Sequence, residues 1–341
     1  QIDDLFYLIL VIVTVVFIGT QIALGYVLWR GADATGEKAL FSHRQQRDQK
    51  WKYLALFLVT LITTTMAGGC HYIGFIQNFG THAIDLTTAE IYLNGLWYSL
   101  PILAILGAHE MGHYLTCRYY NVNTSLPYFL PAPIPLTGTL GAFIRIRQPI
   151  PTKQQLFDIG IAGPIAGFVI AIPVLLLGIG MSRATEIPIS ADNLIELGEP
   201  LLFQFVIWLE WGVLPPGYAI NMHPMAFAAW FGLLATALNL FPIGQLDGGH
   251  ISYTVLGRRS SAITLLMVFC LIGLSLVSSS WIIWTFLTIG MLLAFGLHHP
   301  RTTDEDVPLD RNRIYLAIFA LVMFILCFTP SPIQSMQTVS L

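Results

Sequence analysis

Charge is scarce in this chain. Asp, Glu, Lys and Arg make up 10% of its 341 residues, whereas an ordinary soluble domain carries about 25%. Apolar residues reach 55% and the mean hydropathy is +0.69. Such a chain cannot cover a water-facing surface of its size, which excludes a soluble globular protein. The formal net charge is only −3 and there is no basic run, so nothing points to nucleic acid. The composition predicts a protein that spans a membrane several times.

Paired cysteines are also missing. The four cysteines are scattered singly and none forms a C-x-x-C pair, so we expect small buried apolar residues and no disulfide. The sequence has no internal repeat either. The four cysteines are Cys70, Cys117, Cys270 and Cys327.

Long apolar runs dominate the rest of the chain. A hydrocarbon core of about 30 Å needs about 20 apolar residues per helix, and the runs are continuous, which excludes spanning strands. The first is too long for a signal-peptide core and lacks a basic residue before it, so we expect a retained span. The eight predicted spans are 5–29, 53–77, 93–118, 156–181, 224–248, 261–279, 281–298 and 313–330.

Basic residues fix the predicted orientation. With residue 1 outside, all but one of the 16 basic residues fall in inside loops, and the exception is Arg183. Positive charge gathers on the cytoplasmic side of membrane proteins. The positive-inside rule therefore supports both the count of eight spans and the orientation with both termini outside.

Three connections have a predicted character. Residues 119–155 lie inside and are rich in Pro and Gly. Residues 182–223 lie outside, are acidic, and contain LLFQFVIWLEW (201–211), which is too short to span and suits an interfacial helix. Residues 301–313 are expected to be a solvated inside connection.

Two histidines and a glutamate interrupt the third apolar run in AHEMGHY, residues 108–114. Ionisable groups inside a bilayer are costly and mark functional sites. His109 and His113 are four residues apart, so both imidazoles leave the same helix face. Glu110 lies beside the first, where it can take a proton from a water molecule. The spacing H-E-x-x-H is the zinc metalloprotease signature.

A catalytic zinc needs a third protein ligand and an open position. The strongest candidate is Asp247 in NLFPIGQLDGGH, residues 239–250, because the topology places it at the same depth and side as His109. His250 follows three residues later and could bind the metal or support a ligand. The remaining histidines in or near the spans are expected to bond a neighbouring helix or lie at the interface; they are His71, His82, His298 and His299.

At these residues the chain resembles the site-2 protease family of intramembrane zinc metalloproteases. The motifs occur in the right order: HEMGH (109–113), GTLGAFIRIR (138–147), FDIGIAGPIAGF (157–168) and NLFPIGQLDGGH (239–250). Residues 126–164 look most like the branch shared by bacteria, cyanobacteria and plastids. Bacterial members of the family carry PDZ domains where this chain has only residues 182–223, a connection too short to hold one.

The resemblance implies hydrolysis of a peptide bond in or near a substrate's transmembrane segment. Zinc would be held by His109, His113 and Asp247, with Glu110 as general base. It also implies a re-entrant loop over 136–150 that adds an unwound substrate as a strand, and it assigns substrate contacts. Those contacts are Gly138, Gly141, Phe143 and Asn239, and Gly163, Pro164 and His250 are expected around the zinc ligands. Pro242 should break the fifth helix.

Small residues recur at Gly160, Gly163 and Gly167. Their spacing favours a close helix–helix contact, which is compatible with a role for Gly163 and Pro164 in the wall of the site.

We expect three parts: two spans in 1–92, a catalytic core in 93–257, and three spans with a tail in 258–341. The membrane partner is the lipid bilayer. Missing transit-peptide character favours a bacterial inner membrane, with plastid or thylakoid membranes left open.

Other functions remain open at this point. Loss of His109, Glu110, His113 or Asp247 would indicate a scaffold or a substrate-binding pseudoprotease. None of the four is lost. A channel or carrier would need ionisable residues on several spans facing one path. Apart from the site, the spans of this chain carry almost no charge, which argues against that function. Membrane proteases of prenylated proteins take a glutamate as third ligand, and no E-x-x-x-H motif supplies one.

Overall fold

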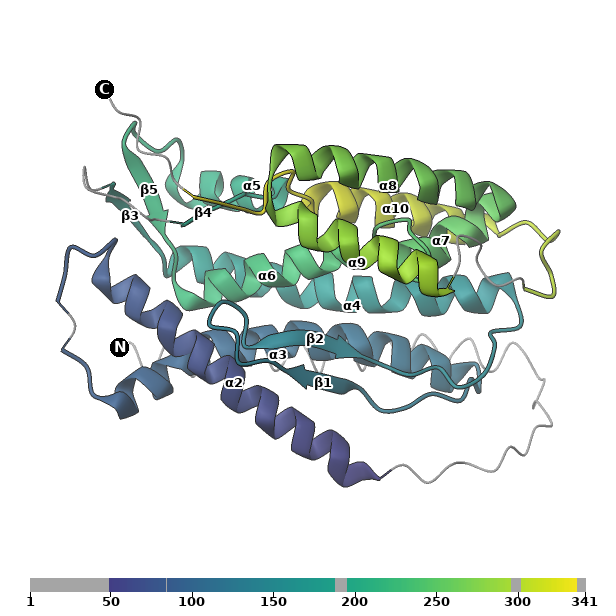
Figure 1. The fold of residues 1–341 in the computed structure, drawn as a ribbon, viewed down its shortest axis with the longest axis horizontal. Helices are drawn as coiled ribbons and strands as arrows, with labels where there is room; N and C mark the ends of the chain where they lie inside the picture. The colour runs from purple at the N-terminus through teal and green to yellow at the C-terminus, as the bar shows by residue number, and fades with distance from the viewer. Residues whose placement is uncertain (1–48, 84, 188–194, 296–301, 336–341) are drawn as a thin grey trace.

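Helices dominate the computed structural model, which describes residues 49–83, 85–187, 195–295 and 302–335 (Figure 1). The predicted first span, 5–29, lies outside the described residues. The helices are α2 Lys50–Gln77, α3 Thr88–Tyr119, α4 Lys153–Gly180, α5 Leu201–Trp211, α6 Pro224–Asn239, α7 Asp247–Leu256, α8 Ser260–Val277, α9 Ser280–Phe295 and α10 Arg311–Cys327. The strands are β1 Tyr128–Pro131, β2 Thr139–Phe143, β3 Arg183–Glu186, β4 Ile195–Leu197, β5 Tyr218–Asn221 and β6 Ile333–Ser335.

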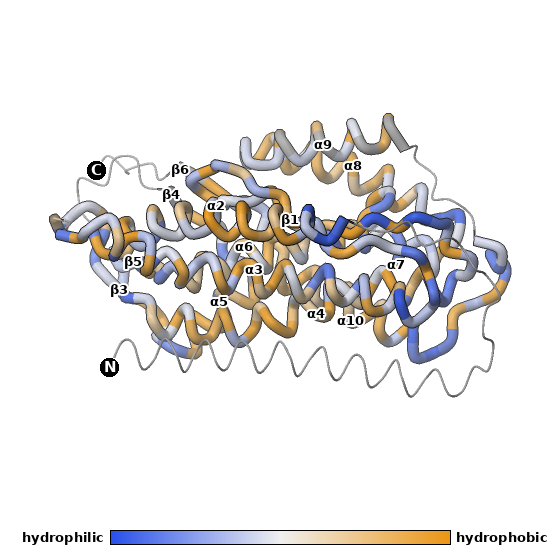
Figure 2. The backbone as a smooth tube through the Cα atoms, turned by 90° about the horizontal axis from the view of Figure 1, so that it is seen from below, coloured by the Kyte–Doolittle hydropathy of each residue, from blue (hydrophilic) through white to orange (hydrophobic). Residues whose placement is uncertain are grey.

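Four helical runs of the described residues are long and apolar enough to cross a membrane. They are Lys50–Gln77, Thr88–Tyr119, Lys153–Gly180 and the combined run Asp247–Val277. Figure 2 shows these helices largely orange, with hydrophilic segments gathered near the end of the molecule where α7 lies. The long axis of the protein therefore corresponds to the direction in which the helices would cross a bilayer.

The predicted span 224–248 is wrong in its second half. Helix α6 ends at Asn239 and α7 begins at Asp247. Pro242 cannot donate a backbone hydrogen bond, and Gly244 has a positive φ of 54°, so the chain turns between the two helices. The break at Pro242 was expected and is confirmed. Helix α8 ends at Val277 and α9 begins at Ser280, so only a tight turn joins them.

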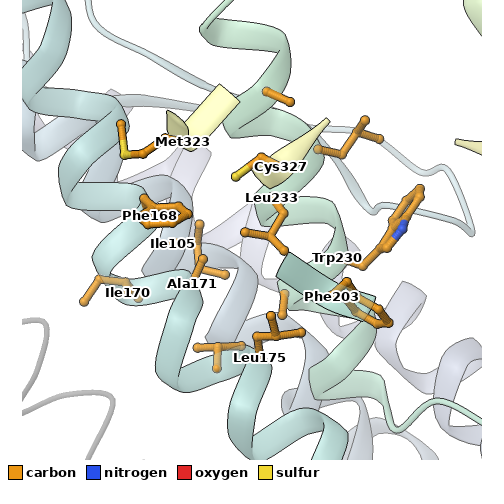
Figure 3. Packing of buried hydrophobic residues seen from close by; sticks show 14 of the residues in the cluster. Ile105, Phe168, Ile170, Ala171, Leu175, Phe203, Trp230, Leu233, Met323 and Cys327 are labelled. Carbon is orange, nitrogen blue, oxygen red and sulfur yellow. The ribbon is translucent and has the colours of Figure 1, made fainter. Parts of the chain in front are cut away.

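Helix α3 is the centre of the bundle. It begins with a capping box, in which Thr87 and Glu90 bond each other's backbone amides, and it packs against α2, α4 and α6. The main core lies among α3, α4, α6 and α10, where Ile105, Phe168, Leu233 and Met323 meet (Figure 3). These close-packed apolar contacts fix the position of α3 along the axis of α4.

An antiparallel hairpin of β1 and β2 lies against α2 and α3, as Figure 1 shows. Tyr128 pairs with Phe143 and Phe129 with Ala142. The tip of the hairpin is held by three side chains of the helices. Thr63 donates to the carbonyl of Gly138 (2.6 Å), Tyr98 donates to the carbonyl of Thr137 (3.0 Å), and the His71 ring bonds the carbonyl of Leu136 (2.9 Å).

The other strands were not predicted, because each is three or four residues long. β3 pairs with β5, and β4 pairs with β6 near the carboxyl terminus. Helix α5 is confirmed over 201–211; Phe203, Val206 and Ile207 are buried, whereas Trp208 is exposed. Its place at the membrane interface remains a prediction.

The connection before α10 is not merely solvated, so the expectation for 301–313 is wrong over its described part. Asp304 accepts a hydrogen bond from the backbone amide of Lys153 at the start of α4 (2.8 Å). The buried Lys153 ammonium donates to the carbonyls of Glu305 and Val307. The loop caps α4 because the first amides of a helix lack partners within it.

The cysteines match the prediction in their free state but only in part in their burial. All four are free, as predicted, but only Cys117 and Cys327 are buried, whereas Cys70 and Cys270 are exposed.

Candidate metal centre

His109 and His113 lie one turn apart on the same face of α3. Both are buried, and their Nε2 atoms are 3.1 Å from each other. The four-residue spacing places both rings on one helix face, as predicted.

Asp247 joins them from the first residue of α7. Its Oδ2 atom lies 3.2 Å from His109 Nε2 and 3.3 Å from His113 Nε2. A tetrahedral zinc ion with bonds of 2.0–2.2 Å places its ligand atoms about 3.3–3.6 Å apart. The three measured separations, 3.1, 3.2 and 3.3 Å, lie at or just below the lower end of that range, and the donor set of two imidazoles and a carboxylate is one that zinc prefers.

Among the described residues, this is the one group of three or more His, Cys, Asp or Glu side chains with converging ligand atoms. The sequence-predicted ligands thus come from three positions, two on α3 and one on α7, that the fold brings together. His250 is not in the group, and its expected support of the ligands remains a prediction.

The ring of His113 is oriented by α4. Its Nδ1 lies 2.7 Å from the backbone carbonyl of Ile159. A carbonyl can only accept, so Nδ1 carries the proton and Nε2 presents its lone pair to the metal position. This contact was missed by sequence reasoning because the acceptor is a backbone atom.

Glycines of α4 make room for the zinc-binding helix. A Cβ atom on Gly163 would overlap the His113 ring, and one on Gly167 would come within 3.2 Å of His109 Cβ. Gly112 approaches the carbonyl of Ala162 in the same way. The predicted close helix contact is confirmed, and Gly163 also forms the floor beneath a ligand. Pro164, which follows it, is buried inside α4.

Glu110 is buried, with 7% of its surface exposed. The backbone amide of Ile144, the residue after β2, lies near the Glu110 carboxylate. The group predicted to be the base therefore lies where α3 meets the end of the hairpin.

Asn239 ends α6 beside the metal position, with its side-chain nitrogen 3.4 Å from His109 Nε2. Its amide can reach a group that is bound at the cluster. The predicted contact with substrate remains a prediction, but the side chain is in the right place for it.

The predicted hairpin residues differ in their surroundings. Gly138, at φ +69°, is pressed against α2, where a Cβ atom would lie 2.5 Å from the carbonyl oxygen of Thr63. Gly141, at φ +103°, has open space beside it, and Phe143 is 44% exposed. The close approach at Gly138 is thus made by α2, and the free room lies at Gly141.

An ion pair lies one residue from the carbonyl that orients His113. Arg313 of α10 donates two hydrogen bonds to Asp158 of α4, at 2.8 and 2.6 Å. Tyr120 donates to the same carboxylate, and burial and this contact raise the pKa of its phenol. Asp158 is the one charged residue of the predicted span 156–181, and this was the signal that could have revealed the contact.

Comparisons with known proteins agree with this geometry. Residues 97–276 match the profile of Peptidase family M50. The chain is 29% identical over 267 residues to "Probable zinc metalloprotease EGY2, chloroplastic" of Arabidopsis thaliana, an alignment covering 76% of this chain and 46% of that protein.

Two further Arabidopsis thaliana proteins are similar. "Probable zinc metalloprotease EGY1, chloroplastic" is 31% identical, with 66% of this chain and 43% of that protein covered. "Probable zinc metallopeptidase EGY3, chloroplastic" is 30% identical, with 74% and 47% covered. The chain spans about half the length of the curated relatives it matches. No solved structure matches.

Proposed function

This chain belongs to peptidase family M50, and from that premise we propose that it is a zinc-dependent endopeptidase that cuts membrane proteins in or near a transmembrane segment. The observation that carries the proposal is the convergence of His109, His113 and Asp247 on one metal position. Glu110 lies beside it, buried at the same depth of α3.

The residues divide the chemistry among them. When bound, zinc supplies a Lewis acid that lowers the pKa of water and polarises a carbonyl group. Glu110 accepts the proton of the attacking water and returns it to the nitrogen of the leaving amine. The backbone amide of Ile144 lies near the Glu110 carboxylate, so the base and the end of β2 are side by side.

A substrate helix must unwind before attack, because its carbonyl groups are bonded within the helix. Strand β2 can hold the unwound segment by strand addition. In the described hairpin, β2 pairs with β1 on one side, and the chain just beyond it faces Glu110 through the Ile144 amide. Gly141 leaves room for a second backbone, and the Asn239 amide can bond the unwound segment near the cleaved bond.

The full topology is also part of the proposal. Four long apolar runs are present, and α6, α9 and α10 are shorter helices of 16, 16 and 17 residues. We infer that these, with the apolar run 5–29, complete eight spans with the metal position toward the inside. The three-part division of the chain remains a prediction. The bacterial inner membrane also remains a prediction, whereas the plant relatives are named as chloroplastic proteins.

The test is the variant Glu110→Gln in the whole chain. It keeps the size of the side chain and the zinc ligands but removes the base. We expect zinc content near one ion per chain, as in the wild type, and a loss of at least 100-fold in cleavage of membrane-protein reporters. The measurement is zinc analysis of the purified protein together with fragment yield. Equal cleavage by both proteins would show that Glu110 is not the base, and absence of zinc and cleavage in the wild type would refute the protease proposal.

A further inference from the structure

A large apolar cavity lies beside the metal centre, with a volume of about 1250 Å³. One wall is the face of α3 formed by Tyr98, Ile102 and Leu106. The facing wall is α6, with Phe231, Leu234 and Leu238. The hairpin residues Thr139, Leu140 and Gly141 line a third side.

The lining of the cavity leads toward the active site along two helices. Tyr98, Ile102 and Leu106 are spaced four residues apart, and the next position on that face is Glu110. On α6, Leu238 directly precedes Asn239. From Tyr98 to Glu110 the helix rises about 18 Å, which an extended chain covers with about five residues. The cavity can therefore hold the five or so substrate residues on one side of the cleaved bond.

The far end of the cavity is polar. Ser278, Ser279 and Ser280 line it at the α8–α9 turn, and Glu196 lines it from β4. Strand pairing and a hydrogen bond hold this end in place. Glu196 pairs with Gln334 of β6, and Ser280 donates to the carbonyl of Ile333 (2.6 Å).

Glu196 is exposed and makes no ion pair with any residue in the part of the chain that the structure describes. Another acid, Glu199, lies close to it, and the pKa of Glu199 is raised by burial and by the negative charge of Glu196. An unpaired carboxylate at the polar end of an apolar cavity, with a second acid nearby, attracts a cation that arrives with an apolar segment.

Resting on the proposed function, we propose that this cavity binds the outer part of a substrate's transmembrane segment and that Glu196 selects substrates with a lysine or arginine at the outer end of that segment. Basic residues are uncommon on the outer flank of membrane spans. The contact therefore distinguishes a minority of membrane proteins from the rest, even though the apolar walls would accept most spans.

The test measures binding to the full chain carrying Glu110→Gln, so that no cleavage is needed. Three single-span reporters share one Leu/Ala segment and carry two Lys, two Gln or two Glu at the outer end. Binding is measured by energy transfer between labelled reporter and labelled protein in phosphatidylcholine vesicles. We expect the Lys reporter to bind at least fivefold more tightly than the Glu reporter.

Adding Glu196→Lys should reverse this order. The matched control adds Glu186→Lys, which places the same charge on β3, away from the cavity lining, and should leave the order unchanged. Equal binding of all three reporters, or the same order with Glu196→Lys, would overturn the selectivity. Cleavage by the wild type is scored separately: reporters that bind with the expected order but are never cut would count against the protease proposal and not against the cavity.

Discussion

Gly163 lies directly beneath the imidazole of His113, where any side chain would take the place of the ring. We expect Gly163→Ala to displace His113 from its bond with the Ile159 carbonyl. Changes to groups that orient a metal ligand cost about 10- to 100-fold in metal affinity, so zinc affinity should fall by at least about tenfold. The measurement is zinc retained after dialysis against a competing chelator.

The matched control for this prediction is Gly273→Ala in α8, which also replaces a helical glycine but has no atom within 4 Å of the added Cβ. It should retain zinc like the wild type. If both variants retain it equally, the approach of α4 does not position the ligand.

At this scale the sequence predicted the side chains and missed the backbone. His109 and His113 follow from helical spacing, and Asp247 follows from its depth in the predicted topology. The backbone groups beside them are the carbonyl of Ile159, which orients His113, and the amide of Ile144, which lies near Glu110. Every residue carries such groups, so residue type cannot reveal which of them will be used.

Helix α10 is attached to α4 by the ion pair between Arg313 and Asp158, whose side chains are about one-fifth exposed. We expect Arg313→Ala to leave the Asp158 carboxylate with too few partners and to lower the free energy of unfolding by about 2 kcal/mol. Thermal or denaturant unfolding in detergent measures this. Arg313→Lys should be intermediate, because an ammonium cannot reproduce the two parallel bonds.

Arg311→Ala is the control, since this arginine lies on the same helix but is exposed. Its unfolding should match that of the wild type. A similar loss in both variants would mean that α10 is sensitive to any loss of charge and that the pair with Asp158 contributes little.

Among the elements, the apolar helices were predictable, including the short α5, whereas the separate helix α7 and the short strands β3 to β6 were not. Continuous apolar runs gave α2, α3 and α4 within a few residues. The merged prediction 224–248 failed because hydropathy does not fall between α6 and α7, although Pro242 signalled the break. The 301–313 connection appeared solvated by composition, but Asp304 and Lys153 pair across more than 150 residues, which no local pattern reports.

The whole molecule has a predicted orientation that can be checked directly. In a background with Cys70 and Cys270 replaced by serine, Tyr218→Cys should react with an impermeant maleimide added outside intact cells, because Tyr218 is 42% exposed in the predicted outside connection. Asp306→Cys, exposed in the loop before α10, should react only after the membrane is opened.

The opposite labelling pattern would invert the topology, and labelling of both sites in intact cells would rule out the eight-span map. The charge distribution predicted this orientation as a whole, because the positive-inside rule sums over every loop. It could not predict how the helices pack around α3, since packing depends on shape at individual positions such as Gly163 and Gly112.

The cap on α4 has a consequence for how the protein is made. Once translation has reached residue 247, the three proposed zinc ligands and Glu110 have all been made. The segment that caps α4 and the arginine that pairs with Asp158 lie later in the chain, within 302–313. A growing chain therefore contains every chemical group of the site well before the site is fixed in place. We expect the site to become fixed only once the last helix has been made, because the cap on α4 and the ion pair with Asp158 cannot form before then.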